Sequence, residues 1–372
     1  MDSATIERGI AGLEESCARG HDATGLFGEM SDRLQRLVPF DGALWFATDP
    51  ATVLATAPAR IENVEDGHCE TYWEREFRVE DALLFRDLAR TDTGVGTLYD
   101  VTGGNPGRSA RHREFGAPQG YGDEMRAALR VGTSTWGVLS LMRERGRAPF
   151  GARDVELVRA IAPVLGDALR MLAVRTAAAV PADLGPGTAL YGPDGVLLSL
   201  DEPAERLFQE LGGPGWLPRT LPMTPVSAVL AQALAVEQGR ERGPASARVR
   251  AATGRWLSLH ASCLRGVDGQ PGPVALTIEP AKSAQLAPII VEAYRLTVRE
   301  QEITRAVARG LSNPEIAAQL FLSPHTVRDH LKAVFAKVGV ASRGELVATL
   351  FADHYAPALH APGVAVEHVH RG

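Results

Sequence analysis

The chain has 372 residues, of which 45% are hydrophobic and 23% are charged, and its formal net charge is −6. This length and composition indicate two or three packed globular domains and exclude an intrinsically disordered chain. No apolar run is long enough to cross a membrane, so we expect a cytoplasmic protein without membrane contacts. The cysteines, Cys17, Cys69 and Cys263, form no C-x-x-C pair, which argues against a disulfide framework and a metal site.

The first predicted domain, residues 1–176, mixes helices with antiparallel strands. The predicted ranges are a helix over 25–37, strands over 40–47, 122–131 and 134–143, and a long helix over 149–174 with one apolar face. This order of elements resembles a GAF-type sensor domain. The resemblance implies a small-molecule pocket between the sheet and its covering loops.

Three tryptophans, Trp45, Trp73 and Trp136, are the candidate lining of that pocket, because ligand sites are commonly apolar and aromatic. The alternative is that these rings are core, the usual place of aromatic residues in a sheet-rich domain. The segment YWEREFRVEDALLF, with Trp73 and Asp81, is similar to part of the autoinducer-binding domains of quorum-sensing regulators. Little else in the domain matches that pattern.

The second predicted domain, residues 185–280, starts with two short strands around a turn at 192–195. Asp201 is placed to cap the helix that follows, and strands near 245–250, 255–264 and 273–279 close the domain. This order resembles a PAS-like module. Neither a heme nor a flavin signature accompanies it, so we expect no cofactor.

Residues 281–295 form a predicted linker, after which the helix-start pattern S/T-x-x-E occurs at Thr297, Ser312 and Ser342. In such a capping box, the hydroxyl and the carboxylate satisfy backbone N–H groups at the start of a helix. Ser323 marks a further start, because Pro324 follows it at a position that tolerates proline. Residues 296–355 are therefore predicted to form four helices, followed by a flexible tail over 356–372.

The helix after Ser323 has one apolar and one polar face. Val327, Leu331, Val334, Phe335 and Val338 recur at helical spacing, while His325, Arg328, Asp329 and Lys332 fall on the other side. Only Phe321 and Leu322 separate this helix from the preceding one. Two helices joined by so short a turn are typical of a helix-turn-helix, whose second helix enters the major groove of DNA.

Residues 296–351 resemble the LuxR-type helix-turn-helix family. The motif LTxRE opens the block at 296–300, and SNxEIAxxLxxSxxTVxxHLxxxxxKxGVxSRxEL runs from 312 to 346. The resemblance implies sequence-specific binding to double-stranded DNA. One departure is Pro314, where many relatives have a lysine that can contact phosphate, so one backbone contact is expected to be missing.

In a helix-turn-helix, side chains on the polar face of the second helix read the bases. Arg328 and Lys332 are suited to donate to guanine O6 and N7, and Asp329 to accept from a cytosine amino group. A solvated helix face would carry the same residues. The candidate phosphate contacts are Asn313, Ser323, Thr326, Lys337 and Arg343, of which Ser323 is also needed as a cap.

Charge is distributed unevenly along the chain. Residues 323–343 carry four Lys/Arg and one Asp, whereas residues 1–295 carry 31 Lys/Arg and 38 Asp/Glu. A basic footprint this small predicts weak binding by one copy and useful binding by two. Leu346 and Leu350 of the last helix are the candidate contacts between subunits, and the alternative is that they close the four-helix core.

The sequence thus predicts a multidomain α+β protein, with GAF-like and PAS-like antiparallel-sheet sensor domains followed by an all-α LuxR-type helix-turn-helix domain. No P-loop, nucleophile elbow or H-E-x-x-H motif is present, so no catalytic or metal-binding residue is assigned and no enzyme is expected. The expected function is a homodimeric transcriptional regulator on an inverted repeat, modulated by a small molecule or a protein partner. Two alternatives are an interaction protein that binds no metabolite and a degraded enzyme domain at the N-terminus.

Overall fold

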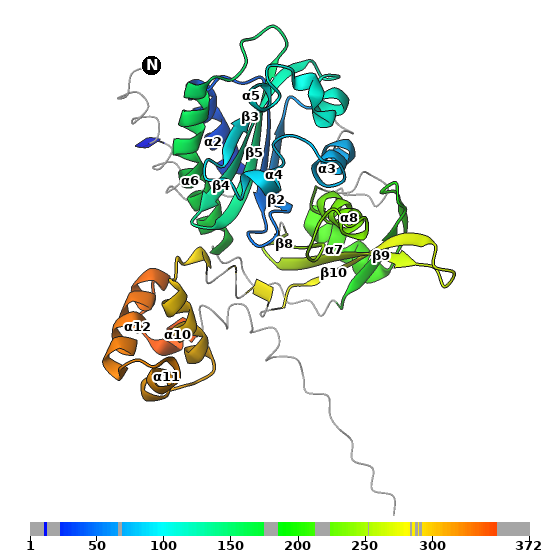
Figure 1. The fold of residues 1–372 in the computed structure, drawn as a ribbon. Coiled ribbons are helices and arrows are strands. Elements are labelled where there is room, and N and C mark those ends of the chain that lie inside the picture. Colours follow the sequence, from blue (N-terminus) through cyan, green and yellow to red (C-terminus); the bar gives the residue numbers. More distant parts are fainter. Residues whose placement is uncertain are drawn as a thin grey trace, which may run out of the picture. The chain divides into compact units, whose positions relative to one another are not determined.

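The computed structural model describes residues 11–12, 23–65, 69–174, 185–212, 224–251, 253–282, 285–286, 289 and 292–347. The chain divides into two compact units. The first holds Met1–Ala178 and Asp183–Ala281, and the second holds Ala179–Ala182 and Lys282–Gly372. The first unit contains two five-stranded antiparallel sheets, and the described part of the second is helical (Figure 1). None of the described helices is both long and apolar enough to span a bilayer.

The first sheet has the strand order β2-β1-β5-β4-β3. Helices α2 and α6 cover one face, and α3 and α4 lie on the other (Figure 1). The strands are β1 (Gly42–Thr48), β2 (Ala55–Glu62), β3 (Val95–Thr97), β4 (Tyr121–Val131) and β5 (Ser134–Glu144). The helices are α2 (Ala23–Leu37), α3 (Cys69–Phe77), α4 (Phe85–Leu88), α5 (Leu98–Val101), η1 (Pro106–Arg108), η2 (His112–Gly116) and α6 (Ala152–Val174).

Strand β1 lies in the interior of this sheet and is buried along its whole length, because helices cover both faces. Helix α6 approaches the sheet closely at Gly166, where an added Cβ would lie 2.9 Å from the carbonyl oxygen of Leu129. A side chain at this position would push the helix off the sheet.

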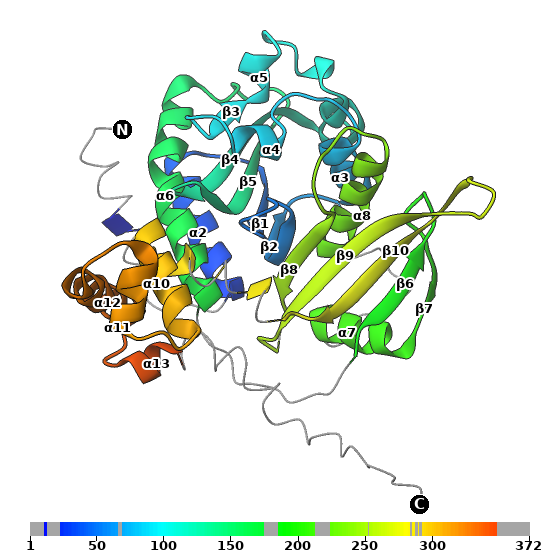
Figure 2. The same ribbon diagram turned by 60° about the horizontal axis from the view of Figure 1, so that its bottom comes forward.

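The second sheet has the order β7-β6-β10-β9-β8. Its strands are β6 (Gly187–Tyr191), β7 (Leu197–Leu200), β8 (Ser246–Arg250), β9 (Trp256–Arg265) and β10 (Pro271–Pro280). Helices α7 (Glu202–Gly212) and α8 (Thr224–Glu237) pack against it (Figure 2). The apolar core forms between these helices and the alternate strand residues that face them, such as Leu259 and Ile278, which are fully buried.

The two sheets belong to one compact unit because several contacts join them. The Asp49 carboxylate, at the end of β1, accepts hydrogen bonds from the backbone N and from Nε and Nη2 of Arg248 on β8. Asp49 is 2% exposed, so this ion pair is shielded from water. Arg86 pairs with Glu241, and α3 packs along α8. The predicted boundary between two sensor domains, at 177–184, lies outside the described residues and stays a prediction.

Most predicted elements of the first unit are confirmed within one to three residues. The turn at 192–195 is closed by a hydrogen bond from the backbone N of Gly192 to the oxygen of Val196, and Asp201 Oδ1 accepts from the backbone N of Ala204 at 2.8 Å. Strand β2 and helix α3 were not predicted. No bounds were predicted for helix α8, because residues are buried around its whole circumference and the apolar pattern has no helical period.

The second unit contains α10 (Val298–Ala308), α11 (Asn313–Leu320), α12 (Pro324–Val338) and α13 (Arg343–Val347). Complete capping boxes start α10 at Thr297 and α11 at Ser312, as predicted. At the start of α13, Ser342 Oγ accepts from the backbone N of Glu345 at 3.1 Å. The side chains Ile303, Ile316, Val327 and Val334 have no exposed surface and form the core of the unit.

Candidate functional site

Helix α12 is held at both ends by local geometry. Ser323 Oγ accepts from the backbone N of Thr326 at 3.0 Å, and Pro324 occupies the first turn. Gly339, with φ of 77°, ends the helix in the left-handed conformation that glycine tolerates. Val327, Leu331, Val334 and Val338 are buried against the other helices, and Phe335 is half-buried, so the predicted apolar face is confirmed.

The opposite face of α12 carries Arg328, Asp329 and Lys332, all of them exposed. Within the described residues, neither Arg328 nor Lys332 forms an ion pair or a hydrogen bond. Asp329 Oδ2 lies 3.0 Å from Nδ1 of His325, one turn earlier on the same helix. Two cations one turn apart are therefore available to an external partner, while the carboxylate between them already has a neighbour.

The candidate phosphate contacts near the start of α12 are hydroxyls. Ser323 Oγ, which caps α12 by accepting from the backbone N of Thr326, also shares a hydrogen bond of 2.9 Å with Thr326 Oγ1. Asn313, in the first turn of α11, is half-buried, and its Oδ1 accepts from Nη1 of Arg343 at 3.4 Å. The structure places Ser323 and Thr326 together at one helix terminus and Asn313 beside Arg343.

The Lys337 ammonium is bound by groups of its own domain. Its Nζ lies 2.6 Å from Oε2 of Glu300, in the capping box of α10, and 3.2 Å from the oxygen of Arg295. Glu300 is 5% exposed. Burial by itself raises the pKa of Glu300, but the hydrogen bonds from Lys337 and from the backbone N of Thr297 outweigh it and hold that pKa below its ordinary value. The contact of Lys337 with phosphate, predicted from the sequence, stays a prediction.

Arg343, the second cation among the predicted phosphate contacts, also has internal partners. Its Nη2 donates to the oxygen of Leu311, and Nη1 reaches Asn313. The guanidinium therefore links α13 to the segment between α10 and α11. Arg343 and Lys337 differ in this from Arg328 and Lys332, although the sequence gives all four as surface cations.

The proposed subunit contact on α13 takes a different role in the structure. Leu346 has no exposed surface, so it closes the core of its own domain and offers no area to a second chain. This matches the alternative in which the last helix completes the four-helix unit. Leu350 lies outside the described residues.

The three candidate pocket tryptophans are core residues. Trp45 is fully buried and lies 5.9 Å from the ring of Phe27 on α2, whereas its neighbour Phe46 lies 5.0 Å from Trp73 on α3. Successive residues of a strand point to opposite faces, so Trp45 and Trp73 lie on opposite sides of the sheet and do not line one pocket. Trp136 is 3% exposed.

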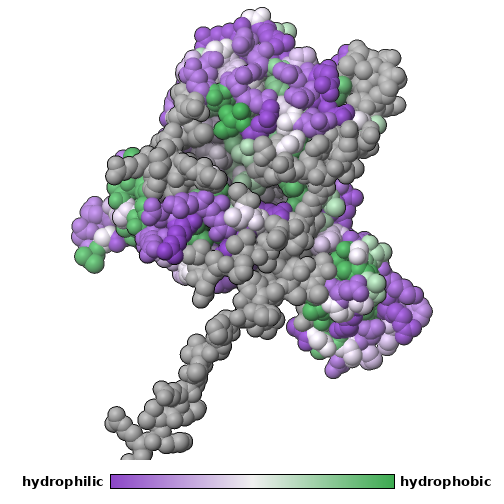
Figure 3. Space-filling view, turned by 180° about the vertical axis from the view of Figure 1, so that it is seen from behind, coloured by the Kyte–Doolittle hydropathy of each residue, from purple (hydrophilic) through white to green (hydrophobic). Residues whose placement is uncertain are grey.

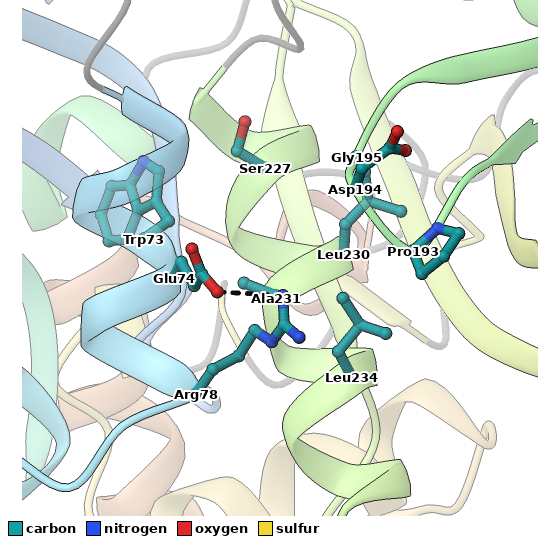
Figure 4. A pocket seen from close by; sticks show the side chains of 10 residues that line it. All are labelled: Trp73, Glu74, Arg78, Pro193, Asp194, Gly195, Ser227, Leu230, Ala231 and Leu234. Atoms are coloured by element: carbon teal, nitrogen blue, oxygen red, sulfur yellow. Dashed lines mark ion pairs between the residues drawn. The ribbon is translucent and has the colours of Figure 1, made fainter.

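Trp73 does line a cavity, which lies between α3, α8 and the turn joining β6 to β7 (Figure 4). Leu230 and Leu234 of α8 point toward the turn at Pro193 and Asp194, and Arg78, which follows α3, pairs with Glu74 of that helix (Figure 4). The cavity volume is about 40 Å³. This is room for a few water molecules and is below the size of a metabolite site.

Buried charged side chains lie among the aromatic rings on the α3 face of the first sheet, and the sequence did not indicate them. Arg126 of β4 has no exposed surface, donates to Tyr72 and to Glu76 at 2.9 and 2.8 Å, and lies 3.5 Å above the ring of Phe85. Arg111 is equally buried and donates from Nε and Nη2 to Glu124 at 3.0 Å. The two arginines and two glutamates therefore form a buried ion-pair network.

A second cavity of about 10 Å³ borders this network beside Arg111, His112 and Glu124, which is space for one water molecule. Burial lowers the pKa of His112 and outweighs the opposing effect of Glu124. Nη1 of Arg111 is buried without a hydrogen-bond partner in the described structure. No cluster of three metal-ligating side chains occurs among the residues described.

Figure 3 shows that the described surface on one side of the molecule is mostly hydrophilic, with small separate apolar patches.

Comparison with known proteins identifies the C-terminal segment. Residues 294–350 match the family described as bacterial regulatory proteins, luxR family. A helix-turn-helix-type transcriptional regulator of Mycobacterium bovis is 54% identical over 52 residues, which cover 14% of this chain and 6% of that protein. The transcriptional regulatory protein YhcZ of Bacillus subtilis is 47% identical over 62 residues, covering 17% of this chain and 28% of that protein. The chain thus spans under a third of the length of either relative.

Among solved structures, Escherichia coli SdiA aligns over 93% of this chain and 96% of its own, with 13% identity and a TM-score of 0.33. Neither fold nor function follows from a similarity at this level.

Proposed function

We propose that this chain, whose residues 294–350 form a helix-turn-helix domain of the LuxR family, is a sequence-specific DNA-binding transcriptional regulator. In this proposal α12 lies in the major groove, with Arg328 and Lys332 donating to guanine and Asp329 accepting from cytosine. The observation that supports it best is the pair of exposed cations on α12 that have no partner among the described residues. A charge left free on a helix whose other face is buried is suited to an external partner.

Phosphate contacts in the proposed complex come from Asn313, Ser323 and Thr326, near the N-termini of α11 and α12. Helix N-termini favour anions because their first N–H groups and the helix dipole point at the ligand. Lys337 and Arg343 take a different part in this proposal. Because their charged groups already bind Glu300 and Leu311, they hold the domain together, and any phosphate contact they make is secondary.

We infer that two copies of the chain bind together on an inverted repeat. One helix-turn-helix covers one half-site, and half-site centres in such operators lie about 10 bp apart. The small basic footprint between residues 323 and 343 supports two copies, because few phosphate contacts give weak binding by one. Since Leu346 is buried, the surface that joins the copies lies elsewhere in the chain.

The first unit, in this proposal, acts as the sensor through a GAF-like module at 1–176 and a PAS-like module at 185–280. The linker 281–295 connects it to the DNA-binding domain at 296–355 and the tail at 356–372. An effector acts only if its affinity differs between two arrangements of the DNA-binding domains. The effector is a small molecule or a protein partner.

One observation favours the protein partner. The ion-pair network lies on the α3 face of the first sheet, and two cavities lined by described residues, of about 10 and 40 Å³, hold only water-sized groups. A metabolite library tested by thermal unfolding separates the two effectors, because a ligand stabilises the chain in proportion to RT ln(1 + [L]/Kd). Stabilisation by a library compound supports the small-molecule sensor. Capture of a protein that binds the first unit, with no stabilising compound, supports the partner.

The DNA-binding function is tested by enriching genomic fragments on the purified full-length chain and sequencing those retained. A shared motif with two-fold symmetry is the expected result. The Arg328→Ala variant should lose the motif, whereas Arg299→Ala, which removes a half-buried cation paired with Glu302 on α10, should keep it. Recovery of fragments without any common motif would refute sequence-specific binding.

A further inference from the structure

Phe321 ends helix α11 in an unfavourable backbone conformation. Its φ and ψ are 55° and 46°, in the left-handed region. L-residues with a side chain are disfavoured in this region because Cβ crowds the backbone, and glycine avoids that penalty. Glycines take the left-handed position after the other long helices of the domain, Gly310 after α10 and Gly339 after α12. A phenylalanine at the corresponding place therefore destabilises the isolated domain.

The ring of Phe321 is also unburied. Its exposed fraction is 95%, whereas Phe27 and Phe208 in the first unit have no exposed surface. The backbone N–H of Phe321 caps the oxygen of Ala317, and glycine would supply the same bond. An exposed ring gains nothing from the hydrophobic effect in the free chain. Within the described structure, no contact offsets the left-handed backbone or the exposed ring. A partner that covers the ring would bury apolar surface and so offset both.

The position of Phe321 in the helix-turn-helix indicates which partner. It lies in the turn between α11 and α12, two residues before Ser323, whose hydroxyl caps α12 beside Thr326. When a second helix enters the major groove, the first helix crosses the backbone of the duplex, so the turn runs along a sugar–phosphate strand. The free cations Arg328 and Lys332 continue from the same end of α12, and the charge of this segment complements that strand.

We propose that the Phe321 ring packs on the deoxyribose groups of the DNA strand that borders the major groove, and that the left-handed backbone aims it there. The inference rests on the proposed DNA-binding function and adds an apolar, sequence-independent contact to it. Deoxyribose presents C–H groups between charged phosphates, and a flat ring covers them without displacing the hydrogen bonds of the neighbouring Ser323 and Thr326. Phe321 is thus a positioning and affinity residue with no part in reading bases.

The test compares full-length variants on a mixed-sequence 30-bp duplex at low salt, because a contact with sugar does not require the operator. Phe321→Gly should bind about tenfold more weakly, comparable to the loss of one aromatic stacking contact. Phe321→Tyr keeps the ring and should bind as the parent does. Val298→Ala, which trims another exposed apolar side chain of the domain, 74% exposed, should leave binding unchanged.

A second readout separates contact from structure. Since glycine relieves the left-handed strain, amide hydrogen exchange in α11 and α12 should become slower in Phe321→Gly although DNA binding weakens. Binding equal to that of the parent would overturn the inference while leaving the proposed function intact, and so would faster amide exchange. If the parent chain itself bound no duplex, the proposed function would fail first. A change in self-association with unchanged DNA affinity would assign the ring to a protein contact and also overturn it.

Discussion

The two units of the chain differ in how their charged side chains are buried and paired. In the first unit, Arg111 and Arg126 have no exposed surface, and each is bound to a buried glutamate. On α12 of the second unit, Arg328 and Lys332 are exposed and have no partner among the described residues. Buried charges are costly unless paired, so those of the first unit serve its own structure. Unpaired exposed charges add little to folding, which leaves them for a ligand.

Breaking the buried network should give the largest effect on stability. Arg126→Leu removes the partner of Glu76 and leaves that carboxylate, 1% exposed, without its cation. The expected loss is about 3–5 kcal/mol of unfolding free energy for the first unit, because an uncompensated charge remains buried. Denaturant unfolding followed by tryptophan fluorescence measures it.

An exposed ion pair of the same unit provides the matched control. Arg206 pairs with Glu202 across one turn of α7, and its side chain is 59% exposed. Arg206→Ala should cost less than about 0.5 kcal/mol. If Arg126→Leu were equally mild, the network would not stabilise this unit and the contrast between the two units would fail.

Removing Arg328 or Lys332 should weaken DNA binding without changing the unfolding free energy. Arg328→Ala and Lys332→Ala should each cost about 1–3 kcal/mol at the operator, with non-specific binding mostly kept. Neither variant removes an ion pair of the described residues, so the unfolding free energy of the domain should not change. Titration of operator and scrambled duplexes measures both affinities. An equal loss on all sequences would instead make these side chains phosphate contacts.

Much of the structure of the second unit can be predicted from its sequence, because local sequence patterns determine where its helices start and which face of α12 is buried. The hydroxyls at Thr297, Ser312 and Ser323 cap their helices in the structure as the S/T-x-x-E pattern and Pro324 predict. The apolar spacing along α12 gives its buried face directly. Such signals involve residues within one or two turns of each other, so they do not depend on tertiary contacts.

The long-range contacts could not be predicted in the same way. Glu124 and Arg126 alternate along β4 and point to one face, a pattern that usually marks a solvated side of a strand. Their partners lie outside β4, Arg111 13 residues from Glu124 and Glu76 50 residues from Arg126, and both resemble surface residues in the sequence. Likewise, the sequence does not show that Lys337 pairs with Glu300, 37 residues away, whereas Lys332 on the same helix has no ion pair or hydrogen bond among the described residues.

Lys337 is partly exposed and paired, so it lies between the buried ion pairs of the first unit and the unpaired cations of α12. Its substitution should lower stability moderately. Lys337→Met removes the hydrogen bond to Glu300 and should lower the unfolding free energy of the second unit by about 1 kcal/mol, since the ammonium is partly exposed. The slope of log affinity against log salt should stay unchanged. A slope reduced by about one unit would show that Lys337 contacts phosphate after all.

The smallest expected effect is the pH dependence that Glu300 gives to the second unit. Its pKa is lowered in the folded chain, so the unfolded chain binds the proton first as the pH falls through the ordinary value of 4.5. Where the unfolded state binds more protons, stability rises with pH. The contribution of this carboxylate is therefore complete above that value and is lost as the pH falls through the lower pKa of the folded state.

Glu300→Gln isolates this contribution, because glutamine keeps the size of the side chain and cannot titrate. The difference in melting temperature between the parent and the variant, measured by calorimetry on the transition of the second unit, should be largest near neutral pH and shrink below about pH 4. Arg126→Leu should leave this pH dependence unaltered, because Arg126 belongs to the first unit. A difference that stayed constant with pH would show that Lys337 stabilises Glu300 without preferring its charged form.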